Sequence, residues 1–242
     1  MLLHRLCPEG PSCQQSANAQ FLAKQGAVPS KPGSLAYHRQ PMLEQRIQQQ
    51  FFDSADLHYR AAEVLARPID AAAQALVAGL TSGGRVLVAG LGPSAALAQL
   101  VACALVGRFE RERPGLAAVV LGADAVSLAA LANLSAQSRF DQVLARQIDT
   151  LGQPGDLLLL TTTQSDGPAL LAAVRAAQAK DMTVVALTGQ NAGALGAALA
   201  ETDVLLAVPH ERQARVLETQ LLVLHCLCDA IDQQLLGEQD PE

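Results

Sequence analysis

Three segments of the chain carry residues that could bind an anion. In Gly90-Leu91-Gly92-Pro93-Ser94, glycines allow a tight turn into a helix that Ser94 would cap. Residues 161–167 read Thr-Thr-Thr-Gln-Ser-Asp-Gly, and consecutive hydroxyls at a helix N-terminus can donate to a phosphate together with backbone N–H groups. Asp124 follows a separate apolar run. Together they predict an anion-binding site, with Ser94, Asp124, Thr162, Thr163, Gln164 and Gly167 as the candidate binding residues.

Each of these segments also has a purely structural explanation. The Gly90–Ser94 segment lacks the third glycine and the later acidic residue of a dinucleotide site, so it could be an ordinary strand-to-helix turn. Asp166 would repel a phosphate, and Ser165 or Asp166 could simply cap the next helix. Asp124 could cap a helix beginning at Ala125, and we favour this interpretation.

The elements that must position these residues alternate along the chain. Short apolar runs bounded by turn residues predict five buried strands, at 85–90, 116–122, 155–163, 182–189 and 203–209. Helical patterns lie between them, at 94–107, 125–133, 138–151, 167–179 and 192–200. This alternation predicts an α/β fold with a doubly wound parallel sheet, which would bring the three segments to the carboxyl ends of strands.

Helical patterns also flank the predicted sheet. Residues 43–84 form one or two amphipathic helices, with Pro68 either a break or a first helical residue. Residues 211–236 form a long closing helix that is apolar around more than half of its circumference. Because such a helix is buried on several sides, we expect an oligomer interface there, with Phe51 and Phe52 as natural companions.

Residues 1–41 differ from the rest of the chain. They are rich in Pro, Gly, Gln and Ser and show no helical or strand period, so we expect a disordered N-terminal extension. Whether Met42 is the biological start stays open. Residues 42–242 then form the folded domain.

The composition argues against several classes of partner. The net charge is −6 and no run of Lys or Arg occurs, so direct binding to nucleic acid is not expected, although a basic protein could bind. No apolar run is long enough to span a membrane. We expect Cys103, Cys226 and Cys228 to be buried free thiols rather than metal ligands. Free thiols suit a reducing compartment, which predicts a cytoplasmic protein.

From about Met42 onward, the chain resembles the SIS-domain family. The resemblance rests on residues 90–94, on Gly107-Arg108-Phe109 with Arg113-Pro114, on residues 162–167 and on residues 184–189. The similar groups are the phosphoheptose isomerases (GmhA) and the DnaA initiator-associating proteins (DiaA), and Cys226-Leu-Cys-Asp-Ala-Ile-Asp232 looks DiaA-like. The resemblance implies a flavodoxin-like sheet, a homotetramer and a phosphosugar ligand.

The chain departs from the isomerases where they place a metal site and a base. The matching positions hold Leu100, Ala104 and Leu217, and His225 alone is kept. One histidine cannot hold a divalent ion, and isomerisation needs a base, so we expect no metal, no cofactor and no catalytic residue. His225 is expected to be a core or interface residue.

These departures predict a non-catalytic protein, and the resemblance to the DiaA group implies that its partner is the replication initiator DnaA. Leu235 and Leu236 are the candidate contacts, unless they belong to a frayed tail. The alternative is a phosphosugar-binding protein, or a degenerate isomerase acting on sedoheptulose 7-phosphate. A helix-turn-helix regulator is a weaker option, because residues 1–41 are too short and too rich in Pro and Gly for that domain.

Overall fold

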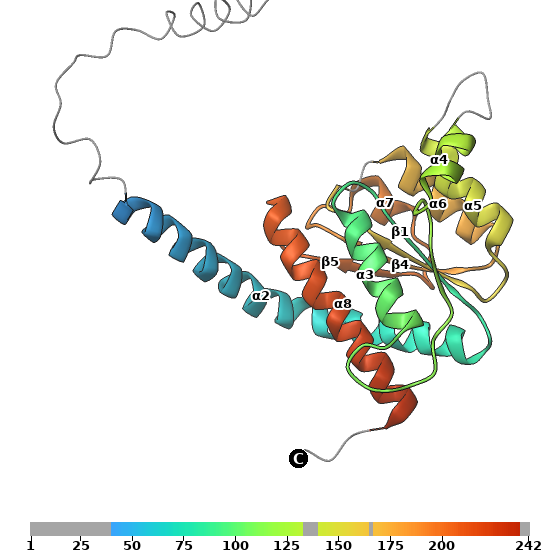
Figure 1. The fold of residues 1–242 in the computed structure, drawn as a ribbon, viewed down its shortest axis with the longest axis horizontal. Helices are drawn as coiled ribbons and strands as arrows, with labels where there is room; N and C mark the ends of the chain where they lie inside the picture. Colours follow the sequence, from blue (N-terminus) through green and yellow to red (C-terminus); the bar gives the residue numbers. More distant parts are fainter. Residues whose placement is uncertain (1–39, 133–139, 165–166, 238–242) are drawn as a thin grey trace, which may run out of the picture. The chain divides into compact units, whose positions relative to one another are not determined.

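A parallel five-stranded sheet forms the centre of the domain (Figure 1). The computed structural model describes residues 40–132, 140–164 and 167–237. By its internal contacts the chain divides into two compact units, residues 1–47 and 48–242. The strand order is β2-β1-β3-β4-β5. The strands are β1 (Val86–Gly90), β2 (Ala118–Val120), β3 (Leu157–Thr161), β4 (Thr183–Thr188) and β5 (Val204–Ala207). This confirms the predicted doubly wound, flavodoxin-like fold.

The helices agree with the predicted alternation. In chain order they are α2 (Gln40–Thr81), α3 (Ser94–Val106), α4 (Ala125–Ala132), the 3-10 turn η1 (Phe140–Gln142), α5 (Val143–Leu151), α6 (Pro168–Gln178), α7 (Gly193–Ala198) and α8 (Gln213–Leu236). The sequence left open whether residues 43–84 form one or two helices, and in the described residues they belong to the single helix α2, with Pro68 inside it. Residues 1–39 lie outside the described part, so the predicted extension stays a prediction.

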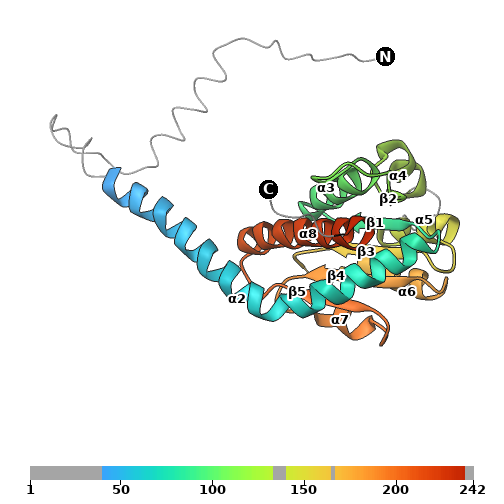
Figure 2. The ribbon, with the colours of Figure 1, turned by 90° about the horizontal axis from the view of Figure 1, so that it is seen from below.

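Side chains of the strands alternate between two apolar cores. On β3, Leu157 and Leu159 face one core, while Leu158 and Leu160 face the other. Helices α2, α3 and α8 cover the first face, and α5, α6 and α7 cover the second (Figure 2). Because both faces are covered, the central strands are mostly apolar, and β3 and β4 each end in a threonine.

The register of the sheet gathers the loops of the candidate site. Gly90 pairs with Thr161, and Thr161 pairs with Leu187, so β1, β3 and β4 end side by side. The chain runs from β1 outward to β2 and then returns to β3 on the other side of β1. The crevice between β1 and β3 is therefore the switch point where α/β sheets bind ligands.

Helices α3 and α8 pack against each other, and the exposed residues of α3 carry no charge. Leu100 is 41% exposed and Leu222 is 43% exposed. The expectation of buried thiols is wrong for Cys103 and Cys226, which are exposed on these helices, whereas Cys228 is buried. Helical periodicity correctly placed these cysteines on helices. Their apolar sequence neighbours did not show whether each cysteine faces the core or the exposed side of its helix.

Within the described ranges, no helix is both long enough and apolar enough to cross a membrane. The cytoplasmic location remains a prediction.

Candidate functional site

A polar cleft lies at the carboxyl ends of β3, β4 and β5. Its volume is about 580 Å³, and its lining residues are Thr163, Gln164, Gly167, Gly189, Gln190, Asn191, His210 and Glu211. A narrower recess of about 250 Å³ continues toward β1, where Leu91, Gly92, Pro93, Thr162 and Gln213 join the lining. The recess therefore lies at the switch point between β1 and β3, and the larger cleft adjoins it at the ends of β4 and β5.

The loop after β3 contributes fewer free groups than its composition suggests. The Thr162 hydroxyl donates to the Gln164 carbonyl at 2.6 Å and accepts from the Gln164 N–H at 3.0 Å. The Thr161 hydroxyl donates to the Ser94 carbonyl at 2.9 Å. These bonds fix the loop, so Thr163 and Gln164 are the side chains that it offers to the cleft.

Gln220 on α8 anchors this loop through hydrogen bonds of its side-chain amide. Its Nε2 donates to the carbonyl of Thr162 at 2.7 Å and to that of Leu187 at 3.2 Å, and the side chain is fully buried. Since Thr162 follows β3 and Leu187 is in β4, one amide joins the ends of both strands to α8. Gln220 therefore positions the cleft without lining it.

Ser94 differs from the sequence expectation. The residue is the first of α3, the N-cap position is Pro93, and no side chain caps the helix. Its side chain is fully buried and does not line the cleft. The N–H groups of Ser94, Ala95 and Ala96 donate to the carbonyls of residues 91–93. This helix start therefore has few donors left for an anion.

Asp124 is also away from the cleft. Its Oδ1 accepts from the Val126 N–H at 3.0 Å, which is the geometry of a cap on α4. At the start of α6 the N-cap is Gly167, which has no side-chain cap, while Ser165 and Asp166 lie outside the described residues. Of the six candidate ligands, the structure brings together Thr162, Thr163, Gln164 and Gly167.

The electrostatic character of the cleft is neutral to slightly acidic. The described lining residues of the large cleft and of the recess include no Lys or Arg, and Glu211 adds a carboxylate. His210 Nδ1 accepts from the Arg212 N–H at 2.9 Å, which leaves Nε2 as the donor of a neutral ring. Amides of Gln164, Gln190, Asn191 and Gln213 suit hydroxyl groups better than they suit a phosphate dianion.

The sequence analysis missed the contribution of β4 and β5 to this site. Gln190, Asn191, His210 and Gln213 lie just after these two strands. The rule that ligands bind at carboxyl ends applies to every parallel strand, so it could have found them.

Three positions of this chain match those where the resemblance to the isomerases implies a metal site and a base. The residues at these positions cannot take those roles. Leu100 and Ala104 are on α3, and Leu217 is on α8. In the part of the chain that the structure describes, no three His, Cys, Asp or Glu residues could hold one ion together. The available side chains thus provide neither the donor set of a metal nor a base at these positions.

His225 has an aromatic neighbour instead. It is half-buried, and its ring centroid lies 5.5 Å from that of Phe109 at an interplanar angle of 36°. This contact joins α8 to the segment after α3. The geometry is that of a packed histidine, as expected.

Known proteins are similar to this chain over most of its length. The family model described as "SIS domain" matches residues 50–189. A phosphoheptose isomerase of Methylibium petroleiphilum is 56% identical over 199 residues, which cover 82% of this chain and 98% of the relative. A DnaA initiator-associating protein DiaA of Yersinia pseudotuberculosis is 44% identical, and the match covers 82% of this chain and 100% of that protein.

A solved structure of a phosphoheptose isomerase has a similar fold. The phosphoheptose isomerase GmhA of Neisseria gonorrhoeae superimposes with a TM-score of 0.73 at 38% identity, covering 79% of this chain and 99% of the other. The parallel sheet, its strand order and these matches agree. The chain belongs to the SIS-domain family.

Proposed function

We propose that this chain is a non-catalytic SIS-domain protein that assembles into a homo-oligomer and binds a protein partner, the replication initiator DnaA. The observation that carries the proposal is the apolar character of Leu100, Ala104 and Leu217, where relatives with isomerase activity would need a metal site and a base. DnaA as the partner rests on the name of the DiaA relative.

The outer faces of α3 and α8 support the proposed assembly. The exposed residues of α3 are Ala96, Gln99, Leu100, Cys103 and Val106, none of which is charged. On α8, Leu222 and Cys226 are also exposed, and Asp229 adds one charge to the same face. Burial of such surface in a symmetric interface is favourable by about 25 cal/mol per Å². A homotetramer would present several copies of one partner-binding surface and so strengthen weak contacts.

The assembly is tested by Leu100→Lys with light scattering. A charge in a buried interface should shift the protein to smaller species. Glu110→Lys is the control, because Glu110 is exposed and lies beyond α3. An unchanged mass for Leu100→Lys would rule out this face as the interface.

The end of α8 is the proposed partner surface. Leu236 is 39% exposed, whereas Leu235 is half-buried and packs against the core. We therefore propose Leu236 as the contact residue, since Leu235 already packs inside the domain. The acidic residues that follow lie outside the described part.

Binding of immobilised DnaA to the purified oligomer tests this surface. Leu236→Asp should weaken binding without changing the mass of the oligomer, because it removes an exposed apolar contact. Gln234→Asp introduces the same charge at a neighbouring exposed position and should bind like the unmodified protein. Equal binding by both variants would reject Leu236 as a contact.

A second candidate function is phosphosugar binding, and the polar cleft of about 580 Å³ favours it. Thermal unfolding with millimolar sedoheptulose 7-phosphate should raise the Tm if the cleft is a site. Gln190→Ala should remove that rise, while the exposed Gln233→Ala should retain it. No shift for the unmodified protein would reject this candidate.

An isomerase assay with added zinc separates the two candidates. We expect no conversion of sedoheptulose 7-phosphate, because a base and a metal donor set are missing at the matching positions. Turnover would contradict the non-catalytic proposal directly.

A further inference from the structure

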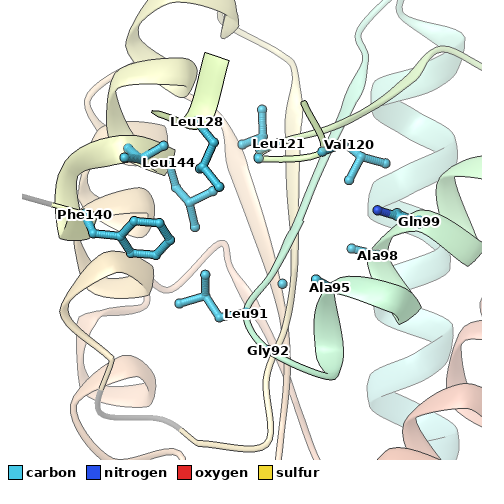
Figure 3. A pocket seen from close by; sticks show the side chains of 14 residues that line it. Leu91, Gly92, Ala95, Ala98, Gln99, Val120, Leu121, Leu128, Phe140 and Leu144 are labelled. Carbon is cyan, nitrogen blue, oxygen red and sulfur yellow. The ribbon is translucent and has the colours of Figure 1, made fainter. Parts of the chain in front are cut away.

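A second cavity lies at the carboxyl ends of β1 and β2, and Leu91 and Gly92 line both this cavity and the recess of the polar cleft. Its volume is about 180 Å³. Figure 3 shows Phe140 and Leu91 on adjacent sides of the space, with Ala95 and Ala98 of α3 opposite Phe140. Because its described walls come from six elements (β1, α3, β2, α4, η1 and α5) and from the loops after β1 and β2, it is a built cavity rather than a flat apolar patch.

The walls combine small residues on one side with branched and aromatic side chains on the other. Ala95 and Ala98 leave the space open on the α3 side. The opposite walls contain Leu121, Leu128, Phe140, Val143 and Leu144. Among the described lining residues, Gln99 alone has a polar side chain.

Backbone groups at the base of the cavity already have partners. The Leu121 N–H donates to the Val88 carbonyl at 2.8 Å. The Gly122 N–H donates to Gln147 Oε1 at 2.8 Å. These bonds remove two donors that a sugar hydroxyl or a water molecule could otherwise have used.

The side chains that line the cavity indicate which kind of small molecule it could bind. An ordered buried water needs about two to four polar partners, which these walls do not supply. An engineered cavity of about 150 Å³ with similar side chains stays dry and binds benzene. We infer that this cavity is a binding site for a compact apolar or aromatic small molecule, of about the size of one ring.

The inference does not rest on either proposed function. It concerns a different set of side chains from those of the polar cleft, apart from the shared wall at Leu91 and Gly92. Phe140 is 52% exposed, so its ring also provides an aromatic surface at the cavity that a ring-shaped guest can contact.

Titration of the full chain with benzene, followed by methyl NMR, tests the site. Saturable shifts are expected for methyl groups of Leu91, Leu121 and Leu144, and none for Leu236. Glycerol, a polar molecule of similar size, should produce no saturable shift.

Matched variants assign the binding to the cavity. Ala95→Leu places three more carbons in the space and should weaken benzene binding by at least about tenfold. Ala96→Leu is the control, since Ala96 is exposed on the same helix and does not line the cavity. Phe140→Ser is a second variant at an exposed position, and it should also weaken binding.

Several results would overturn the inference. One is the absence of saturable shifts in the unmodified protein. Another is unchanged benzene affinity in both Ala95→Leu and Phe140→Ser. Gln190→Ala, which alters only the polar cleft, should leave benzene binding unchanged, so failure of phosphosugar binding and failure of this inference are distinguishable.

Discussion

Arg113 and Asp232 form a buried ion pair in which Nε and Oδ1 are 2.5 Å apart and the side chains are 1% and 2% exposed. The same guanidinium donates to the carbonyls of Ala104 and Leu105 at 2.8 and 2.9 Å. One side chain thus provides hydrogen-bond donors for two carbonyls in the last turn of α3 and joins that helix to α8. The pair also fixes the segment that brings Phe109 to His225.

Loss of either partner should be strongly destabilising. Arg113→Met or Asp232→Leu leaves one buried charge without its counter-ion, and each should lower the free energy of unfolding by about 3–5 kcal/mol. Chemical denaturation measures this change. The double variant should lose less than the sum of the single variants, and strict additivity would mean that the pair is not coupled. Arg108→Met, in the exposed pair with Glu112, is the control and should change stability little.

The thiol of Cys228 should be unreactive in the folded protein. Burial, reinforced by the negative charge of Asp232, raises the pKa of Cys228 to about 12, and Arg113 acts in the opposite direction. A thiol reagent at pH 8 should modify exposed Cys103 and leave Cys228 unmodified until the chain unfolds. Mass spectrometry of labelled peptides distinguishes these residues. Rapid labelling of Cys228 would contradict its burial.

The same pKa shift predicts a loss of stability at alkaline pH. Between pH 9, the ordinary value, and about pH 12, the folded state keeps the Cys228 proton while the unfolded state releases it. A rise in pH through this window therefore favours unfolding. Cys228→Ala should show a smaller fall in the free energy of unfolding between pH 9 and 11. A parallel fall in both proteins would assign the effect to other groups.

Gln220 is expected to stabilise the ends of β3 and β4. Gln220→Leu leaves the carbonyls of Thr162 and Leu187 without this donor and should cost about 1–3 kcal/mol of folding free energy. Denaturation measures the loss, and hydrogen exchange should show less protection of the Gln164 N–H. Gln233→Leu, at an exposed position on the same helix, is the control. Equal effects of the two variants would exclude a specific role for Gln220.

Gly90 should not accept a side chain. A Cβ there would lie 2.4 Å from the Ser94 carbonyl oxygen and 2.6 Å from Thr161 Oγ1, so Gly90→Ala must displace the start of α3 from β1 and should cost about 1–3 kcal/mol. At Gly167 the nearest atoms would lie 4.0 Å away, which makes Gly167→Ala the matched control. Similar melting temperatures for the two variants would contradict the close approach at Gly90.

The sheet could be predicted because its central strands are apolar on both faces and are separated by turn residues. The edge strand β2 is shorter than predicted, since Ala118–Val120 pair with β1 alone. The loop after β3 was found from its hydroxyls, but the sequence did not show that Thr162 uses its hydroxyl locally. Ser94 was misassigned as a cap because a favourable residue type at a helix start does not determine where the first turn begins.

Other features depend on contacts between distant residues and had no local signal. The pairing of Arg113 with Asp232 joins positions 119 residues apart. The exposure of Cys103 and Cys226 depends on how α3 and α8 pack, and periodicity alone does not decide which face is covered. The apolar cavity arises from Ala95 and Ala98 facing residues of α4 and α5, which separate segments of the sequence supply.

The four consecutive leucines of β3 also affect how the chain folds. This strand is central, so it is complete only when it pairs with β1 on one side and β4 on the other. The Arg85 N–H, which precedes β1, reaches the Asp156 carboxylate across 71 residues of sequence. Non-local parallel pairing of this kind is slow to form, and an apolar segment exposed in the meantime is prone to aggregate. Refolding yield should therefore fall as protein concentration rises, with β3 as the segment that limits recovery.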